Sequence, residues 1–484
     1  MGSADFTDSD EGWCPEPGGP LAGMRVAVSG TGAAVGHAGR LLASLGAAVV
    51  SGDHSWHEVD GAIDAAGVVP STWDGPAVRT VDTTALEDWA GSGAMALTGL
   101  RAGPALRSPG QPASAAWGAL LALELLARIG GRDVVLPGPR VLAERAAVAG
   151  LRRDAPWSPS GMLRLLRAAD GWIGVHLARG TGLLAQWLEM PVPAGDPWPV
   201  VEAVIAERKT WPLAERARAV ELPVGLPSDV DEQLVMRGQL GGVWPFVLDG
   251  QVRRASRCDR PVPAEPRPWR LPSTLVVDLS SRWAGPLCGH LLALLGARVV
   301  KVEDLREPDA ARPGPFFDLL HAGQESVALD LGTEQGRSAR DALVGAADVV
   351  IANVAPPARR SAVWVSITPY GCTGPWARYA GFADDASVAG GLLAVDPETG
   401  LAAPCGDAIA APLAGVNAAL VAVACRMAGG EWFADLALRE QAAATLTAGM
   451  EGTAAPEVAP PVARRPAGRA PTLGADTARV LREL

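Results

Sequence analysis

One stretch of this chain occurs twice, and the repeat constrains the fold more than any other feature. The segment LLASLGAAVV at 41–50 returns 250 residues later as LLALLGARVV at 291–300, changed only at Ser44/Leu294 and Ala48/Arg298. A second pair follows in the same order, GALLALELLARIGGRDVVL from Gly118 and GVNAALVAVACRMAGGEWFADL from Gly415. A bias toward Ala and Leu can produce one such echo by chance, but two in the same order indicate an internal duplication.

Both copies open with the pattern of a strand, a turn, an apolar helix and a second strand. This pattern is seen in MRVAVSGTGAAVGHAGRLLASLGAAVV (24–50) and in LVVDLSSRWAGPLCGHLLALLGARVVKVED (275–304). It is typical of a βαβ unit, and therefore of the α/β fold class with parallel strands.

The chain of 484 residues is too long for one ordinary domain. We expect a disordered tail at 1–20, an abbreviated first copy at 21–150 and a linker at 266–274. Between these, 151–265 has no counterpart in the second copy and is predicted to be a smaller α+β domain. The second copy then fills 275–484.

The second copy keeps strand-like blocks that the first copy has shortened. They are VALDL (327–331), AADVVIANV (346–354) and VWVSITPYG (363–371), whereas the first copy offers only DGAIDAAGVV, AVRTV and AMALTGL. We therefore expect the larger sheet in the second half of the chain.

Composition excludes several classes of partner. A net charge of −11 argues against a nucleic-acid-binding protein, which needs a concentrated cationic face. No long uninterrupted apolar run and no basic, apolar leader is present, so we expect no membrane partner and a cytoplasmic location.

The six cysteines form no C-x-x-C pair and the six histidines show no metal-ligand spacing, so no metal site is expected. Only two lysines occur, so an anion site would use Arg or backbone N–H groups, with Lys301 the exception.

The Gly-rich turn at 30–36 suggests an alternative function. Gly30, Gly32 and Gly36 follow a strand and open a helix, and Asp53 lies about 20 residues further on, which approaches the dinucleotide fingerprint of an NAD(P)-dependent oxidoreductase. The spacing G-x-G-x-x-x-G departs from that fingerprint, and the equivalent turn of the second copy, SSRWAGP, has lost it. A tight turn between strand and helix is the favoured interpretation.

The second copy as a whole resembles a known enzyme family. The segments VVDLSSRWAGPLCGHLLALLGARVVKVED, HAGQESVALDL, AADVVIANV, VSITPYGCTGPWARYAGF and PTLGADTARVLREL match in order and spacing the family III CoA-transferases, the CaiB/BaiF group. This group includes formyl-CoA and carnitine CoA-transferases and α-methylacyl-CoA racemases. The stretch 151–265 is similar to the small domain of that family, and 21–150 to a shortened large domain.

The resemblance implies a Rossmann-like large domain and a small domain, normally in two interlocked chains that hold coenzyme A between them. Here both partners are fused, which implies two Rossmann-like domains, the first abbreviated, around one small domain. One site per chain follows, in a monomeric pseudo-dimer or a homodimer. The implied partners are an acyl-CoA and a small carboxylate.

The resemblance also implies where coenzyme A would lie. In the family, its adenine and phosphates rest on the turn after the first strand and on the ends of the next strands. The matching positions here are Ser281, Arg282, Trp283, Ala284, Leu329 and Asn353. Ligands of doubly wound sheets bind at the carboxyl ends of strands, so the placement is physically reasonable. The alternative for Trp283 is that it only packs the turn.

The nucleophile of the family is missing. Its members carry an Asp four residues before the glycine of the long helix, which attacks the thioester to give a mixed anhydride and then an aspartyl-CoA thioester. The matching positions are Ala411 in the second copy and Ser114 in the first. The racemase branch also needs a His where this chain has Phe382.

Three carboxylates are candidates to replace the missing groups. Asp407 lies one turn ahead of Ala411, and a shifted helix start would present it as the nucleophile. Asp384 and Asp385 are adjacent, so one of them can hold a raised pKa and act as a general base. The alternative for this pair is a helix N-terminal acid pair favoured by the helix dipole.

Two functions therefore stay open beside the oxidoreductase. One is transfer of CoA between an acyl-CoA and a carboxylic acid. The other is a catalytically impaired protein that binds CoA esters.

Overall fold

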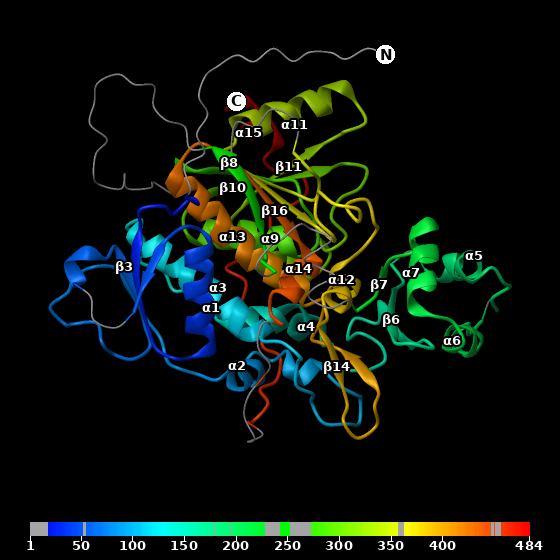
Figure 1. Ribbon diagram of the computed structural model, residues 1–484. Coiled ribbons are helices and arrows are strands. Elements are labelled where there is room, and N and C mark those ends of the chain that lie inside the picture. Colours follow the sequence, from blue (N-terminus) through cyan, green and yellow to red (C-terminus); the bar gives the residue numbers. More distant parts are fainter. Residues whose placement is uncertain are drawn as a thin grey trace, which may run out of the picture.

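The computed structural model describes residues 18–484 except for 52–54, 179, 194, 228–242, 252–272, 357–362, 447–449 and 451–455. Most of the tail predicted at 1–20 and most of the linker predicted at 266–274 lie outside the described residues. The remainder is a mixed α/β structure with two parallel sheets (Figure 1).

The first half contains a four-stranded parallel sheet. Its order is β2-β1-β3-β4, with β1 at Arg25–Ser29, β2 at Ala48–Val50, β3 at Gly61–Asp64 and β4 at Ala77–Arg79. The helices of this half are α1 (Ala33–Ser44), α2 (Ala85–Gly91), α3 (Pro112–Ile129) and α4 (Glu144–Ala149). The predicted third block, AMALTGL, is not a strand but contains a short 3-10 helix at Met95–Leu97.

The second half contains a seven-stranded sheet in the order β11-β10-β9-β12-β13-β16-β8. Its strands are β8 (Val247–Gln251), β9 (Leu275–Asp278), β10 (Arg298–Asp304), β11 (Glu325–Leu329), β12 (Val349–Ala352), β13 (Val363–Thr368) and β16 (Glu431–Ala437). All neighbours pair in parallel except β16 with β8. The central strands are Val-rich and buried on both faces, as helix-covered parallel strands require.

The helices of the second half connect and cover these strands. They are α9 (Ala284–Leu294), α10 (Pro315–His321), α11 (Glu334–Ala346), α12 (Ala383–Ala389), α13 (Ala410–Ala428), α14 (Leu438–Ala443) and α15 (Thr477–Arg482). A two-stranded hairpin, β14 (Leu393–Val395) with β15 (Ala402–Pro404), lies between α12 and α13.

The two repeated stretches have the same topology. The order β2-β1-β3-β4 of the first sheet matches β10-β9-β12-β13 within the second. Helices α1 and α9 both end at a glycine with φ near +100°, Gly46 and Gly296, a conformation that glycine adopts without strain. The repeat in sequence is therefore a repeat in structure.

The second echo also occupies equivalent places. A β-carbon on Gly118 of α3 would lie 2.6 Å from the carbonyl oxygen of Ala34 in α1. A β-carbon on Gly415 of α13 would lie 2.7 Å from the carbonyl oxygen of Ala284, which is 250 residues after Ala34. Each long helix thus approaches the first helix of its own half through a glycine.

Helices α3 and α13 also pack against each other and join the two halves in one hydrophobic core (Figure 1). Both are long and apolar enough to cross a membrane by length and composition, but 78% and 89% of these segments are buried inside the protein. They are the central core helices of this fold.

A smaller unit lies to one side of the two sheets (Figure 1). It contains an antiparallel sheet in the order β5-β6-β7, with strands Leu163–Arg167, Trp172–His176 and Val224–Gly225. Helices α5 (Leu184–Leu188), α6 (Trp198–Ala206) and α7 (Thr210–Ala219) cover it, and it has its own hydrophobic core. Strand β8 falls in the range 151–265 predicted for this unit, yet it pairs with β16 at the edge of the large sheet.

The glycine contacts lead to a prediction about stability. Gly118→Ala and Gly415→Ala should each lower the free energy of unfolding by about 1–3 kcal/mol, because the added methyl group meets the backbone of the neighbouring helix. Urea unfolding measures this change. Gly345→Ala in α11 is the control, since its β-carbon meets nothing within 4 Å, and it should gain about 0.5–1 kcal/mol. Equal effects at all three sites would contradict the close helix contacts.

Candidate active site

The residues proposed to bind coenzyme A gather at the carboxyl ends of neighbouring strands. Ser281 to Ala284 follow β9, Leu329 ends β11 and Asn353 follows β12. The backbone N–H of Ser281 donates to Oδ1 of Asn353 at 3.1 Å, so two of these strand ends are in direct contact. Leu329 is buried, whereas Ser281 and Asn353 are exposed.

The turn before α9 already has partners for its backbone N–H groups. The N–H of Arg282 donates to Oδ2 of Asp309 at 2.9 Å, and Arg282 itself adopts φ +73°. The exposed guanidinium of Arg282 lies 4.8 Å from the ring centre of Phe382. The group that this turn offers to an anion is therefore the Arg282 side chain rather than its N–H.

Trp283 is buried and packs the turn. It is 3% exposed and meets Phe316 edge to face at 5.3 Å, and the guanidinium of Arg145 lies 5.1 Å from its ring centre. The packing interpretation of Trp283 agrees with this placement. Its contact with Arg145 links the turn to a group of buried charges.

Asp407 is the centre of that group. It lies just before α13, between two residues with positive φ, Gly406 at +63° and Ala408 at +46°. Both carboxylate oxygens accept from Arg145 of α4, with distances of 2.8 Å from Nε and 2.5 Å from Nη2. Asp407 is fully buried, and burial raises its pKa while the charge of Arg145 opposes the rise.

Asp384 connects Asp407 to a histidine of the small unit. Its Oδ1 accepts from the N–H of Ala408 at 3.1 Å, and its Oδ2 lies 3.7 Å from Nε2 of His176, at the end of β6. The N–H of Ala178 donates to Nδ1 of the same ring at 3.2 Å. This bond favours the imidazole form that carries its proton on Nε2, toward Asp384.

Asp385 faces another set of partners. Its Oδ1 accepts from the N–H of Phe382 at 2.7 Å, and its Oδ2 accepts from the hydroxyl of Tyr370 at 3.3 Å. Burial raises the pKa of Asp385 to about 7, while the charge of His176 acts to lower it. Both Asp384 and Asp385 lie in the first turn of α12, as expected for a helix N-terminal acid pair.

Phe382 joins the two parts of the site. The ring of His176 stacks on it with ring centres 4.3 Å apart and an angle of 18° between the planes. The guanidinium of Arg282 packs on the same side chain. An imidazole supplied by β6 thus lies against the position where the racemase branch would need a His.

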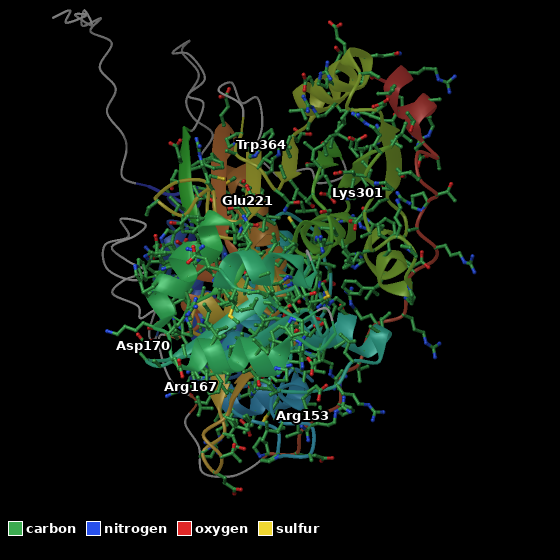
Figure 2. The ribbon with its side chains drawn as sticks, turned by 90° about the vertical axis from the view of Figure 1, so that its right-hand side faces the viewer. Arg153, Arg167, Asp170, Glu221, Lys301 and Trp364 are labelled. Carbon is green, nitrogen blue, oxygen red and sulfur yellow. The ribbon has the colours of Figure 1, made fainter. Side chains whose placement is uncertain are left out.

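Two residues of this site were missing from the sequence prediction, Arg145 and His176. Both are far along the chain from the matched motifs, and neither stands in a motif of its own. Lys301 was predicted as a possible anion ligand, but it is 1% exposed, donates to the carbonyl of Ser280 and lies 3.5 Å from Asp278 (Lys301 is labelled in Figure 2). It is a buried structural cation.

The Gly-rich turn of the first half is closed by a side chain. The carboxylate of Asp82 accepts from the N–H groups of Thr31 at 2.8 Å and Gly32 at 2.9 Å. These are the groups that a dinucleotide motif would present to a pyrophosphate. The tight-turn interpretation of 30–36 accounts for this geometry, and Asp53 lies outside the described residues.

Comparison with known proteins finds a family model that matches the second half of the chain. A family model described as CoA-transferase family III matches residues 271–476. This part of the chain is similar to CoA-transferase family III. Over the described residues, no cluster of three or more His, Cys, Asp or Glu side chains could hold a metal ion.

Family III relatives match parts of the chain. Succinyl-CoA–D-citramalate CoA-transferase of Chloroflexus aurantiacus is 29% identical over 194 residues, covering 34% of this chain and 48% of the relative. Succinyl-CoA:mesaconate CoA-transferase of Haloarcula hispanica is 42% identical over 90 residues, 16% of this chain and 23% of the relative. Succinate–glutarate CoA-transferase of Agrobacterium fabrum is 31% identical over 136 residues, 22% of this chain and 34% of the relative. The chain thus spans less than half the length of these relatives.

Among solved structures, a CAIB/BAIF family protein from Brucella suis is 27% identical to this chain. The superposition covers 37% of this chain and 55% of that protein, with a TM-score of 0.34.

The family III nucleophile position is occupied by Ala411, in the first turn of α13. It is buried. The corresponding Ser114 of the first half donates its hydroxyl hydrogen to Oδ2 of Asp88 at 2.5 Å. Neither position carries a carboxylate, so the carboxylates of this candidate site come from the first turn of α12 and from the turn before α13.

The buried carboxyl of Asp385 predicts a pH dependence of stability. The folded protein holds its proton up to a pH of about 7, whereas an unfolded Asp loses it near 3.8. Between these values the folded state binds more protons, so this group makes stability fall as the pH rises. Asp385→Asn removes this titrating group, so the free energy of unfolding in urea should fall less between about pH 4 and 7 than it does in the wild type. The difference amounts to about 1.4 kcal/mol for each unit by which the folded and unfolded pKa values differ. The exposed Asp341→Asn is the control, and an unchanged slope in Asp385→Asn would refute the assignment.

Proposed function

We propose that this protein transfers coenzyme A between an acyl-CoA and a small carboxylic acid. The observation that carries the proposal is the buried cluster of Asp407, Asp384, His176 and Arg145 beside the turn after β9, in a chain whose second half is a family III region. The names of the relatives, all CoA-transferases that act on carboxylic acids, support the same reaction class.

Asp384 is the proposed nucleophile. Both oxygens of Asp407 are engaged by Arg145 and none of its surface is exposed, whereas Asp384 is 6% exposed and has one oxygen directed at an imidazole. A carboxylate in an ion pair with both oxygens bound attacks poorly, because its charge is neutralised. We therefore assign Asp407 and Arg145 to positioning and Asp384 to attack.

The reaction balances with one carboxylate. An oxygen of Asp384 attacks the acyl carbonyl, the carbon–sulfur bond breaks, and CoA leaves as the thiolate. The thiolate attacks the aspartyl carbonyl of the mixed anhydride, which releases the first acid and leaves an aspartyl-CoA thioester. The acceptor carboxylate repeats both steps in reverse, so Asp384 is regenerated.

His176 is proposed to hold Asp384 in place during these steps. Its Nδ1 is occupied by the N–H of Ala178, so its Nε2–H faces the carboxylate. Asp385, with its raised pKa, is proposed as the proton reservoir of the site. Coenzyme A would lie along Ser281, Arg282, Ala284, Leu329 and Asn353.

Trapping with hydroxylamine tests the nucleophile. The protein incubated with succinyl-CoA and hydroxylamine should accumulate a hydroxamate on Asp384, located by peptide mass spectrometry. Asp384→Asn should abolish the trapped species, while Asp341→Asn on the protein surface should not change it. A hydroxamate on Asp407 would reverse the assignment of the two carboxylates.

A second function, binding of CoA esters without turnover, is favoured by one observation. The family position of the nucleophile is Ala411, and the nearest carboxylate before it, Asp407, is locked by Arg145. Binding of CoA with no hydroxamate on any Asp would establish this second function and exclude transfer.

Arg282 provides a test of coenzyme A binding itself. Arg282→Gln should weaken CoA about tenfold or more, because a charge-assisted contact to phosphate contributes about 1.5–3 kcal/mol. Calorimetric titration with CoA and with pantetheine separates loss of the phosphate contact from a disturbance of the fold. Pantetheine has no phosphate, so its affinity should not change. Equal loss for both ligands would show that Arg282 acts on the fold rather than on phosphate.

We further propose that the chain is a fused pseudo-dimer made of two Rossmann-like domains, 21–150 and 275–484, with one small domain at 151–265. The matching strand orders and the equivalent contacts of Gly118 and Gly415 support a duplication of one ancestral domain. One small domain then gives one site per chain, whether the protein acts as a monomer or a homodimer.

A further inference from the structure

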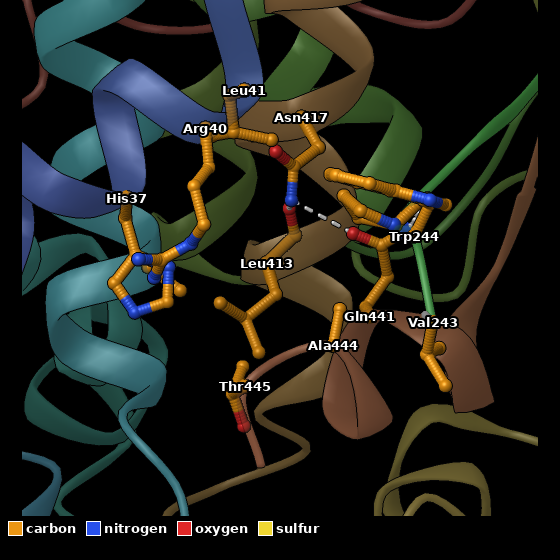
Figure 3. A pocket seen from close by; sticks show the side chains of 12 residues that line it. His37, Arg40, Leu41, Val243, Trp244, Leu413, Asn417, Gln441, Ala444 and Thr445 are labelled. Carbon is orange, nitrogen blue, oxygen red and sulfur yellow. Dashed lines mark hydrogen bonds between the residues drawn. The ribbon is translucent and has the colours of Figure 1, made fainter. Parts of the chain in front are cut away.

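A pocket lies between the two halves of the chain, and the proposed reaction does not use it. It has a volume of about 210 Å³ and is bounded by α1, α3, α13, α14 and the segment 243–245 (Figure 3). Leu41, Leu413, Val243 and Trp244 are among the apolar residues that line it. Its size and lining suit a small molecule with an apolar body.

One side chain of the pocket is a cation that lacks a counter-ion. Arg40 of α1 lines the pocket and is exposed to solvent. Over the part of the chain that the structure describes, no carboxylate forms an ion pair with it. Its neighbour His37 adds no charge at neutral pH, since burial, with the charge of Arg40 in second place, lowers the pKa of His37 to about 4. A cation that lines an apolar pocket and has no carboxylate partner offers a charge-assisted hydrogen bond to an anion bound there.

The pocket also contains a buried acceptor whose orientation is fixed. Asn417 of α13 is 4% exposed, and its Nδ2 donates to the carbonyl of Leu413 at 3.1 Å and to Oε1 of Gln441 at 2.9 Å. Gln441 in turn donates to the carbonyl of Pro245. Among the described residues Oδ1 of Asn417 has no hydrogen-bond partner. Such an acceptor requires a donor, because an unsatisfied buried polar atom costs about 1–3 kcal/mol.

The pocket is separate from the carboxylate cluster. Leu413 and Asn417 lie within about 40° of each other around the axis of α13, whereas Ala411 lies about 160° from Leu413. The pocket therefore faces the opposite side of the helix from the family nucleophile position.

The equivalent place in the other half is filled by the chain itself. His290 of α9 lies 250 residues after Arg40, and its Nε2 accepts from Arg464 of the C-terminal segment at 2.9 Å. The guanidinium of Arg464 also donates two hydrogen bonds to Glu144, at 2.6 and 2.9 Å. In the second half, Arg464 is therefore paired with both Glu144 and His290. In the pocket, Arg40 has no such carboxylate partner among the described residues.

We propose that this pocket binds a small hydroxycarboxylic acid with an apolar chain. The carboxylate of the ligand pairs with Arg40, its hydroxyl donates to Oδ1 of Asn417, and its hydrocarbon part packs between Leu41, Leu413 and Trp244. The inference does not rest on the proposed transfer reaction, because binding is measured without coenzyme A.

The probe is 2-hydroxy-4-methylpentanoate, measured by isothermal titration calorimetry on the full chain. Arg40→Gln should weaken its binding about tenfold or more, and Arg40→Lys should restore part of the affinity, since it keeps the charge but not the planar donor pair. Arg482→Gln removes an exposed arginine from α15 and should not change the affinity. Equal binding to wild type and to Arg40→Gln, or no binding to wild type, would overturn the proposal.

Two related ligands test the role of Asn417. Removal of the hydroxyl, in 4-methylpentanoate, should weaken binding about fivefold, which is the range of one neutral hydrogen bond. The neutral amide of the probe should bind the wild type more weakly than the probe does, by at least the factor that Arg40→Gln causes for the probe. If 4-methylpentanoate bound as tightly as the probe, the hydroxyl would have no partner at Asn417 and the hydroxy-acid assignment would be wrong.

Discussion

Helices α3 and α13 are apolar on almost every side, and such helices are stable in water only when other elements surround them. Each is covered on one side by the first helix of its own half, α1 or α9, and on another by its counterpart from the other half. Neither half can cover its own long helix alone. This shared burial fixes how the two halves sit and determines where the ends of their strands and helices meet.

The junction is also where the charges are buried. Arg145 comes from the first half and Asp407 from the second, and both are held at the start of α13. A buried ion pair stabilises little in net terms, but removal of one partner costs about 3–5 kcal/mol, because the other charge is left alone. The pair therefore locks the position of the turn before α13 and, through the N–H of Ala408, the orientation of Asp384. The small unit completes the site by bringing His176 to Asp384.

More of the fold than of the candidate site could be predicted from the sequence. The α/β class and the strands predicted at 327–331, 346–354 and 363–371 follow from runs of β-branched residues, and they are confirmed by β11, β12 and β13. The candidate residues Asp384, Asp385 and Asp407 stay predictions as catalytic groups. The structure brings Asp384 and Asp407 together around Ala408, while it turns Asp385 toward Tyr370. Arg145 and His176 could not be predicted, because the contacts that give them a role cross more than 200 positions of the sequence.

The sequence by itself determined the local structure and the repeat. Its apolar periodicity specifies each strand and helix, and its glycines specify where α1 and α9 end, because these properties depend on residues near one another along the chain. Its motifs, in a fixed order, also carried the resemblance of the second half to CoA-transferase family III. Only the tertiary structure decided which charges meet, that Asp82 closes the Gly-rich turn, and that Arg40 lines a pocket while its counterpart His290 contacts Arg464. These outcomes depend on the distances in space between side chains that are far apart in the sequence. The packing of α3 on α13 sets those distances, and no local sequence pattern does.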